Sequence, residues 1–236
     1  MAIFFRRVLD YILPVQCKAC GRVIPSAMGP SGFCDPCWAT ARLFTGPACS
    51  RCGRPFESGP DHPCAACESR PPAYDRAAAA GPYEGVLAQA ITLFKYRRKT
   101  GLARPLGALL ADRLAALPPV DLVIPIPLHP RRLREREFNQ SLLLAQEVSR
   151  PAGLPLAYQA VARVGWAPPQ VELSGPDRLT NVRGAFEVRD ASAVAERSVL
   201  LVDDVMTTGA TVNECAKALR KAGAAAVYVL TVARTV

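Results

Sequence analysis

One stretch near the carboxyl end constrains the possible fold more than any other part of this chain. Residues 199–212 read Val-Leu-Leu-Val-Asp-Asp-Val-Met-Thr-Thr-Gly-Ala-Thr-Val. The apolar start predicts a buried strand that delivers Asp203 and Asp204 to its carboxyl end, where open α/β sheets bind ligands. Gly209 then predicts a turn, and the apolar spacing beyond it predicts a helix. The stretch therefore indicates a strand-turn-helix unit with two carboxylates at its ligand-binding edge.

The same unit offers the groups that a phosphorylated sugar requires. Two adjacent carboxylates accept hydrogen bonds from vicinal hydroxyls, while turn amides, a helix dipole and threonine hydroxyls attract an anion. Asp and Thr also cap ordinary turns, but that role does not account for the whole string. We therefore expect a ribose 5-phosphate site here. Its expected residues are Asp203, Asp204, Val205, Met206, Thr207, Thr208, Gly209, Ala210 and Thr211.

Apolar periodicity after residue 72 alternates between helical and extended patterns. The predicted helices cover residues 86–94, 102–117, 139–149 and 212–222, and the predicted strands cover 120–126, 199–202 and 226–233. Residues 160–185 are polar and rich in proline, so we expect a long exposed loop. Residues 163–184 of this loop, which carry Arg163, Arg178 and Arg183, could act as a lid. This alternation predicts an α/β fold with a parallel sheet flanked by helices.

The 199–212 string resembles the signature with which type I phosphoribosyltransferases bind 5-phosphoribosyl 1-diphosphate. The resemblance implies that Asp203 and Asp204 hold the ribose 2′ and 3′ hydroxyls, and that the diphosphate binds as a complex with Mg²⁺. It also implies attack at C1 through an oxocarbenium-like state, in which the leaving pyrophosphate must be neutralised and water excluded.

Basic clusters are the candidates for that neutralisation, and the net charge of +9 suits anionic partners in general. Four arginines at 131, 132, 134 and 136 follow the predicted strand 120–126, and a second cluster surrounds Lys95. A solvated basic surface is the alternative for each cluster. We assign Arg131 and Arg132 to catalysis together with Asp203 and Asp204, and Lys95 and Arg136 to substrate binding.

Eight of the nine cysteines form four CxxC pairs within the first 70 residues. The pairs are Cys17 with Cys20, Cys34 with Cys37, Cys49 with Cys52, and Cys64 with Cys67. Two such pairs complete a tetrahedral four-thiolate site, so the spacing predicts two structural Zn²⁺ ions. Consecutive and interleaved pairings both fit, and iron–sulfur clusters and disulfides are the chemical alternatives. Cys215 falls on an apolar helix face, as a small core residue would.

The change in composition near residue 72 predicts three segments. We expect residues 1–13 to form an amphipathic helix, which either packs on its own domain or contacts a membrane. Residues 14–72 are expected to form a double zinc ribbon, and residues 73–236 the phosphoribosyltransferase-like domain. The start of the chain does not read as a signal peptide, and no run approaches the ~18 apolar residues of a membrane span. We therefore expect a cytoplasmic protein without a membrane span.

The ordered set of motifs is similar to the ComF family, the amidophosphoribosyltransferase-like competence proteins. The matching segments are the paired zinc ribbons, Leu93-Phe-Lys-Tyr-Arg97, Val123-Ile-Pro-Ile-Pro127, residues 131–140, residues 178–186 and residues 199–212. The resemblance implies a part in the uptake of transforming DNA. Glu137 departs from the family pattern, which has glycine there; if that position requires a positive φ, Glu137 is strained.

Two functions of different kinds fit these features. The first is an enzyme that transfers phosphoribosyl to an acceptor that the sequence does not identify. The second is a non-catalytic sensor of the phosphoribosyl ligand that binds single-stranded DNA during uptake, for which affinity should fall steeply with salt. A third hypothesis makes the chain a structural partner of a DNA-uptake motor, through the ribbons or residues 1–13.

Overall fold

The computed structural model describes residues 15–24, 32–165 and 183–236. The helix expected at residues 1–13 lies outside these ranges. Within them, no helix is long and apolar enough to cross a membrane.

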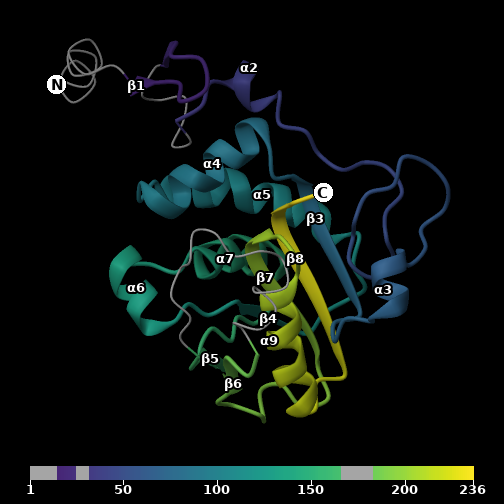
Figure 1. The fold of residues 1–236 in the computed structure, drawn as a ribbon. Coiled ribbons are helices and arrows are strands. Elements are labelled where there is room, and N and C mark those ends of the chain that lie inside the picture. The colour runs from purple at the N-terminus through teal and green to yellow at the C-terminus, as the bar shows by residue number, and fades with distance from the viewer. Residues whose placement is uncertain (1–14, 25–31, 166–182) are drawn as a thin grey trace.

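A four-stranded parallel sheet forms the centre of the fold (Figure 1). The strand order is β3 (Arg76–Pro82), β8 (Ala226–Arg234), β7 (Ser198–Met206) and β4 (Leu122–Pro125). The apolar residues of β7 and β8 are buried on both faces of the sheet, as parallel strands covered by helices require. The predicted α/β class and parallel sheet are confirmed.

Helices cover both faces of this sheet. One face packs against α4 (Gly85–Tyr96), α5 (Ala103–Leu114) and α7 (Gln140–Ala152). The other face packs against α9 (Ala210–Lys221), whose apolar side includes the buried Cys215. The predicted cap of α7 is confirmed, because the Asn139 side chain accepts a hydrogen bond from the Ser141 amide at 3.0 Å. The short 3₁₀ helix η2 (Thr100–Leu102) leads into α5.

Three elements differ from the sequence-based expectation. Strand β3 was not predicted, because its run of four alanines carries no β-branched or aromatic signal. The loop expected over 160–185 is wrong at its start, where β5 (Val161–Arg163) pairs antiparallel with β6 (Phe186–Val188), a strand that begins directly after the expected loop. Residues 166–182, which contain the rest of that expected lid, lie outside the described ranges. The basic segment after β4 forms the helix α6 (Pro130–Arg136), with Pro130 in its first turn.

The amino-terminal module contains the hairpin β1 (Val15–Gln16) with β2 (Val23–Ile24) and the short helices α2 (Asp35–Trp38) and α3 (Ala65–Ser69). Its second half covers the free edge of β3, where the Ala77 amide donates to the Arg51 carbonyl at 2.7 Å. Figure 1 shows α3 beside this strand. The module therefore protects an edge that would otherwise expose unpaired backbone groups.

Candidate functional site

Asp203 and Asp204 lie near the carboxyl end of strand β7 and still within it, because β7 continues to Met206. Lys95, on α4, places its Nζ atom 2.7 Å from Oδ1 of Asp204. Oδ1 of Asp203 accepts hydrogen bonds from Oγ of Ser141 and from the Asp204 amide, both at 2.9 Å. Three segments far apart in the sequence, from α4, α7 and β7, thus converge on two adjacent carboxylates.

The enclosed position of this pair changes its proton affinity. Burial, and then the neighbouring Asp204 charge, raise the pKa of Asp203 to about 7, against the opposing effects of Lys95, the Asp204 amide and Ser141. Burial acts to lower the pKa of Lys95, but Asp204 and then Asp203 outweigh it, so that this pKa lies above its ordinary value. The ammonium of Lys95 is therefore charged at neutral pH, next to both carboxylates.

This arrangement predicts a titration near neutral pH in the ligand-free protein. We expect the Asp203 carboxyl carbon to titrate with an apparent pKa of about 7 in ¹³C NMR. Lys95→Met should raise that value further, because a stabilising positive charge is lost, whereas Lys221→Met on the last turn of α9 should leave it unchanged. Since the folded-state pKa lies above the ordinary value, this group stabilises the fold below about pH 4, and that contribution disappears as the pH rises to about 7. An Asp203 titration near pH 4 would contradict the prediction.

The turn after β7 has the geometry of an anion-binding loop. Gly209 precedes α9 with φ of 77°, and a Cβ atom there would lie 3.0 Å from Cε of Met206. The Thr207 and Thr208 side chains are exposed, and Oγ1 of Thr208 accepts a hydrogen bond from the Ala210 amide at 3.4 Å. Glycine is favoured at 209 because of the left-handed backbone, and a Cβ atom there would also require the flexible end of Met206 to shift.

The other expected loop residues divide by where their side chains lie. Val205 packs against the core on the α4 side of the sheet, and Met206 is buried on the α9 side. Ala210 is also buried, whereas Thr211 is partly exposed in the first turn of α9. Val205 and Met206 can thus offer a ligand only backbone groups, and the hydroxyls come from the threonines.

A basic pocket of about 280 Å³ opens beside the acidic pair. It is lined by Lys95, Tyr96, Arg98, Arg132, Glu135 and Arg136. Arg136 donates to Oε1 of Gln140 at 3.2 Å, and its guanidinium carbon lies 5.1 Å from the centre of the Tyr96 ring. These contacts hold Arg136 in place toward a charge that enters the pocket.

Arg131 and Arg132 separate in the structure, although they are neighbours in the sequence. Arg132 lines the basic pocket, whereas Arg131 does not, and its Nε lies 3.4 Å from Oε1 of Glu135. Successive residues on a helix point in different directions, which accounts for the separation of the two guanidiniums. The structure brings Lys95, Arg132 and Arg136 together at the basic pocket, whereas Arg131 pairs with Glu135 and is not part of the lining.

Glu137 adopts the conformation that its position in the family pattern implied. It ends α6 in the left-handed region, with φ of 67° and ψ of −9°. A non-glycine residue there costs about 1–2 kcal/mol. The Glu137 carboxylate lies 2.7 Å from Nη2 of Arg98, in an exposed ion pair at the rim of the basic pocket. The expected strain is thus present, and this substitution introduces an acidic group beside the basic cluster.

Three residues at this site were not assigned from the sequence. Ser141 holds Asp203, Gln140 holds Arg136, and Tyr96 lies under the Arg136 guanidinium. Gln140 and Ser141 begin a helix whose start lies near the carboxyl end of β4. That position in the chain could have indicated that both residues lie at the site. Tyr96 had no comparable signal, because a tyrosine near a helix end is common on protein surfaces.

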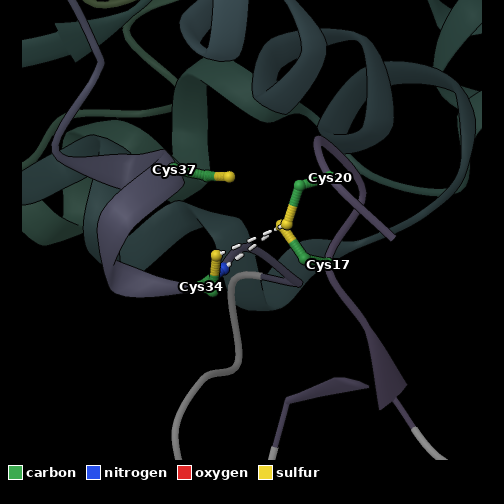
Figure 2. A group of neighbouring side chains, drawn as sticks. All are labelled: Cys17, Cys20, Cys34 and Cys37. Atoms are coloured by element: carbon green, nitrogen blue, oxygen red, sulfur yellow. Dashed lines mark hydrogen bonds between the residues drawn. The ribbon is translucent and has the colours of Figure 1, made fainter. Parts of the chain in front are cut away.

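Two four-cysteine clusters form in the amino-terminal module. Cys17, Cys20, Cys34 and Cys37 make the first cluster, and Cys49, Cys52, Cys64 and Cys67 make the second. Within each, the sulfur atoms lie within 4.8 Å of one another, and Figure 2 shows the first cluster. The consecutive pairing is therefore the one the structure adopts, and the interleaved alternative is wrong. All eight thiols are free, which also excludes disulfides among them.

The clusters fit the residues and geometry of a structural zinc site. The Cys20 and Cys34 sulfurs are 3.8 Å apart, as are those of Cys52 and Cys64. A tetrahedron with Zn–S bonds of about 2.3 Å has edges of roughly 3.8 Å. Backbone amides point at the sulfurs, for example Cys64 N–H at 3.2 Å from Cys49. Burial acts to raise the pKa of the Cys49 thiol, yet these amides, led by Cys52 and Cys64, lower it to about 6 and favour the thiolate that zinc binds.

The comparisons with known proteins agree with both parts of the chain. The double zinc ribbon domain family matches residues 8–68, and the phosphoribosyl transferase domain family matches residues 139–235. Competence protein F of Haemophilus influenzae is 34% identical over 211 residues, which cover 86% of this chain and 91% of that protein. This chain belongs to the ComF family.

Other ComF relatives extend over similar lengths. The DNA utilization protein YhgH of Escherichia coli K12 is 34% identical over 94% of this chain and 98% of its own length. Competence protein ComFC of Bacillus subtilis is 29% identical over 82% of this chain and 80% of its own length. Among solved structures, a glutamine phosphoribosylpyrophosphate amidotransferase from B. subtilis is 23% identical, with a TM-score of 0.38, over 55% of this chain and 25% of that one.

Proposed function

We propose that this chain binds 5-phosphoribosyl 1-diphosphate and transfers its phosphoribosyl group to an acceptor, in the cytoplasm and in connection with DNA uptake. The observation that carries the proposal is the placement of Asp203 and Asp204 directly before an anion-binding turn with a left-handed Gly209. Carboxylates for a diol beside amides and hydroxyls for a phosphate are the two halves of ribose 5-phosphate recognition. The names competence protein and DNA utilization protein among the relatives support the link to DNA.

Each group at the site has a place in the proposed transfer. The bond from C1 to the pyrophosphate oxygen breaks, pyrophosphate leaves with the electron pair, and the acceptor forms a bond to C1 and loses a proton. Asp203 and Asp204 hold the ribose hydroxyls, and residues 206–211 hold the 5-phosphate. Arg132, Arg136 and Lys95 line the adjacent basic pocket, where positive charge would stabilise the departing pyrophosphate.

Magnesium fits the oxygen donors of this site. Carboxylates together with substrate phosphates are the ligands that Mg²⁺ prefers, and the ion would supply further neutralisation of the diphosphate. Among the described residues, Asp203 and Asp204 are the carboxylates at the proposed ribose position.

A screen for pyrophosphate release tests the proposed transfer. The zinc-loaded chain is incubated with 5-phosphoribosyl 1-diphosphate, Mg²⁺ and one of three acceptor classes: nucleobases, primary amines or ammonia. We expect release with one class, and its loss in Asp203→Asn but not in Asp112→Asn, which changes an exposed carboxylate on α5. Donor binding without release in any arm would reject the enzyme and favour the second candidate.

The second candidate is a non-catalytic sensor of the same ligand that binds single-stranded DNA. The net charge of +9 and the arginines of α6 favour it. It predicts that affinity for a single-stranded oligonucleotide decreases linearly with salt on a double-logarithmic plot, and less steeply in Arg132→Ala. Absent or salt-independent binding would reject it.

A DNA-uptake motor as a further partner is addressed by comparing pull-downs with the full chain and with Cys49→Ser.

A further inference from the structure

A second cavity lies on the other side of the phosphate loop, between that loop and the second cysteine cluster. Its volume is about 390 Å³, within the range of small-molecule pockets. One wall is formed by residues 206–210 with Asn213, and the opposite wall by Cys52, Cys64 and Cys67 with the segment around Arg70. The zinc ribbon is therefore one wall of a pocket whose other wall is the expected 5-phosphate site.

Specific contacts hold the two walls together. Nη1 of Arg234, at the carboxyl end of β8, donates to the Cys52 carbonyl. The Ala73 amide donates to Oδ1 of Asn213, on α9, at 2.7 Å. The buried Tyr74 places its hydroxyl 3.5 Å from where a Cβ atom on Gly209 would lie. These contacts fix the ribbon against the loop, so the cavity is a built part of the fold and not a gap between independent modules.

The charge of this cavity suits an anion. Arg54, Arg70 and Arg234 line it, and among the residues that the structure describes no aspartate or glutamate does. Arg234 is buried and faces the thiols, where its charge acts to lower the pKa of Cys52; it therefore offsets the negative charge of the cluster. Arg54 and Arg70 are exposed, and neither guanidinium has a hydrogen-bond or ion-pair partner in the part of the chain that the structure describes. Both are available to a ligand.

The substrate of the proposed transfer does not need this space. In 5-phosphoribosyl 1-diphosphate, the C5 side of the sugar ends in a single phosphate, which the turn at 206–211 would accommodate by itself. The cavity of about 390 Å³ reaches from this turn to Arg54 and Arg70, which leaves room for a group attached beyond that phosphate. The guanidiniums of Arg54 and Arg70, neither of which has a partner among the described residues, match the charged donors that a second phosphate requires.

We propose that the cavity between the phosphate loop and the second zinc ribbon binds the β-phosphate of a nucleoside 5′-diphosphate. The ribose hydroxyls of that ligand lie on Asp203 and Asp204, the α-phosphate lies on residues 206–211, and the β-phosphate lies between Arg54 and Arg70. This inference rests on the proposed ribose 5-phosphate site and extends it to a second class of ligand, which competes with 5-phosphoribosyl 1-diphosphate.

Calorimetric titration of the full zinc-loaded chain with AMP and with ADP tests the inference. We expect ADP to bind roughly tenfold or more tightly than AMP, since charge-assisted hydrogen bonds to two arginines are added. The double variant Arg54→Ala with Arg70→Ala should reduce ADP affinity to that of AMP and leave AMP affinity unchanged. Arg104→Ala removes an exposed arginine on α5, outside the cavity, and should keep the preference for ADP.

The possible results separate this inference from the function on which it rests. AMP binding that depends on Asp203, with no preference for ADP, would overturn the diphosphate site and leave the ribose 5-phosphate site standing. A preference for ADP that survives the double variant would also overturn it, because the overall positive charge of the protein would then explain the tighter binding of ADP without Arg54 and Arg70. Failure of AMP, ADP and 5-phosphoribosyl 1-diphosphate to bind at all would reject both proposals.

Discussion

Asp203→Asn should lower the affinity for 5-phosphoribosyl 1-diphosphate by roughly 10- to 100-fold while the protein remains folded. A hydrogen bond to a charged group contributes about 1.5–3 kcal/mol, and asparagine keeps the shape of the side chain but not its charge. Ser141 Oγ can still donate to the amide oxygen of asparagine, so the contact at 2.9 Å to α7 can be retained. Binding is measured by calorimetry, and folding by circular dichroism and thermal melting.

Asp204→Asn has a second consequence, because it removes the partner of the buried Lys95. An unpaired buried charge costs about 3–5 kcal/mol, so this variant should be less stable as well as weaker in binding. Adding Lys95→Met should recover much of the stability but not the affinity for the ligand. Asp112→Asn is the matched control and should change neither quantity. Unchanged affinity in both Asp203→Asn and Asp204→Asn would contradict the assignment of the ribose hydroxyls to this pair.

Cys49→Ser should reduce the zinc content from two ions to one per chain and lower the melting temperature by on the order of 10 °C. The binding of structural zinc contributes about 10–16 kcal/mol to the folding of zinc-finger peptides. Loss of a metal site is among the most destabilising effects that a single substitution can have. The effect should reach the sheet, because the second ribbon covers β3 through the Arg51–Ala77 hydrogen bond. Zinc is counted by mass spectrometry of the native protein, and stability by calorimetry.

Cys215→Ala provides the control for that experiment. Cys215 is fully buried on α9, and neither four-cysteine cluster includes it. Its replacement should leave both zinc ions bound and cause only the modest loss of stability that a small core cavity produces. If Cys49→Ser retained two zinc ions, or if the native mass showed four fewer hydrogens per cluster instead of bound metal, the structural zinc sites would be rejected.

Local sequence patterns were sufficient to predict the elements that depend on a few consecutive residues. The buried strand before Asp203, the glycine turn at 209 and the helix after it were all predicted, because apolar burial, a left-handed backbone and helical periodicity each act over a few residues. The buried face of α4 and the cap at Asn139 were predicted for the same reason. The four CxxC pairs likewise indicated two metal sites, since a tetrahedral ion brings together ligands of close sequence spacing.

The tertiary structure alone decided which distant groups meet. An alanine-rich segment became the strand β3 because β8 and the second ribbon satisfy its backbone on both sides. The pairing of cysteines into consecutive rather than interleaved clusters also depended on how the ribbons fold. Lys95 and Ser141 reach the acidic pair only because α4 and α7 pack on one face of the sheet. The sequence by itself thus determined the strand-turn-helix with its two carboxylates and the thiol pairs, whereas long-range packing determined what surrounds them.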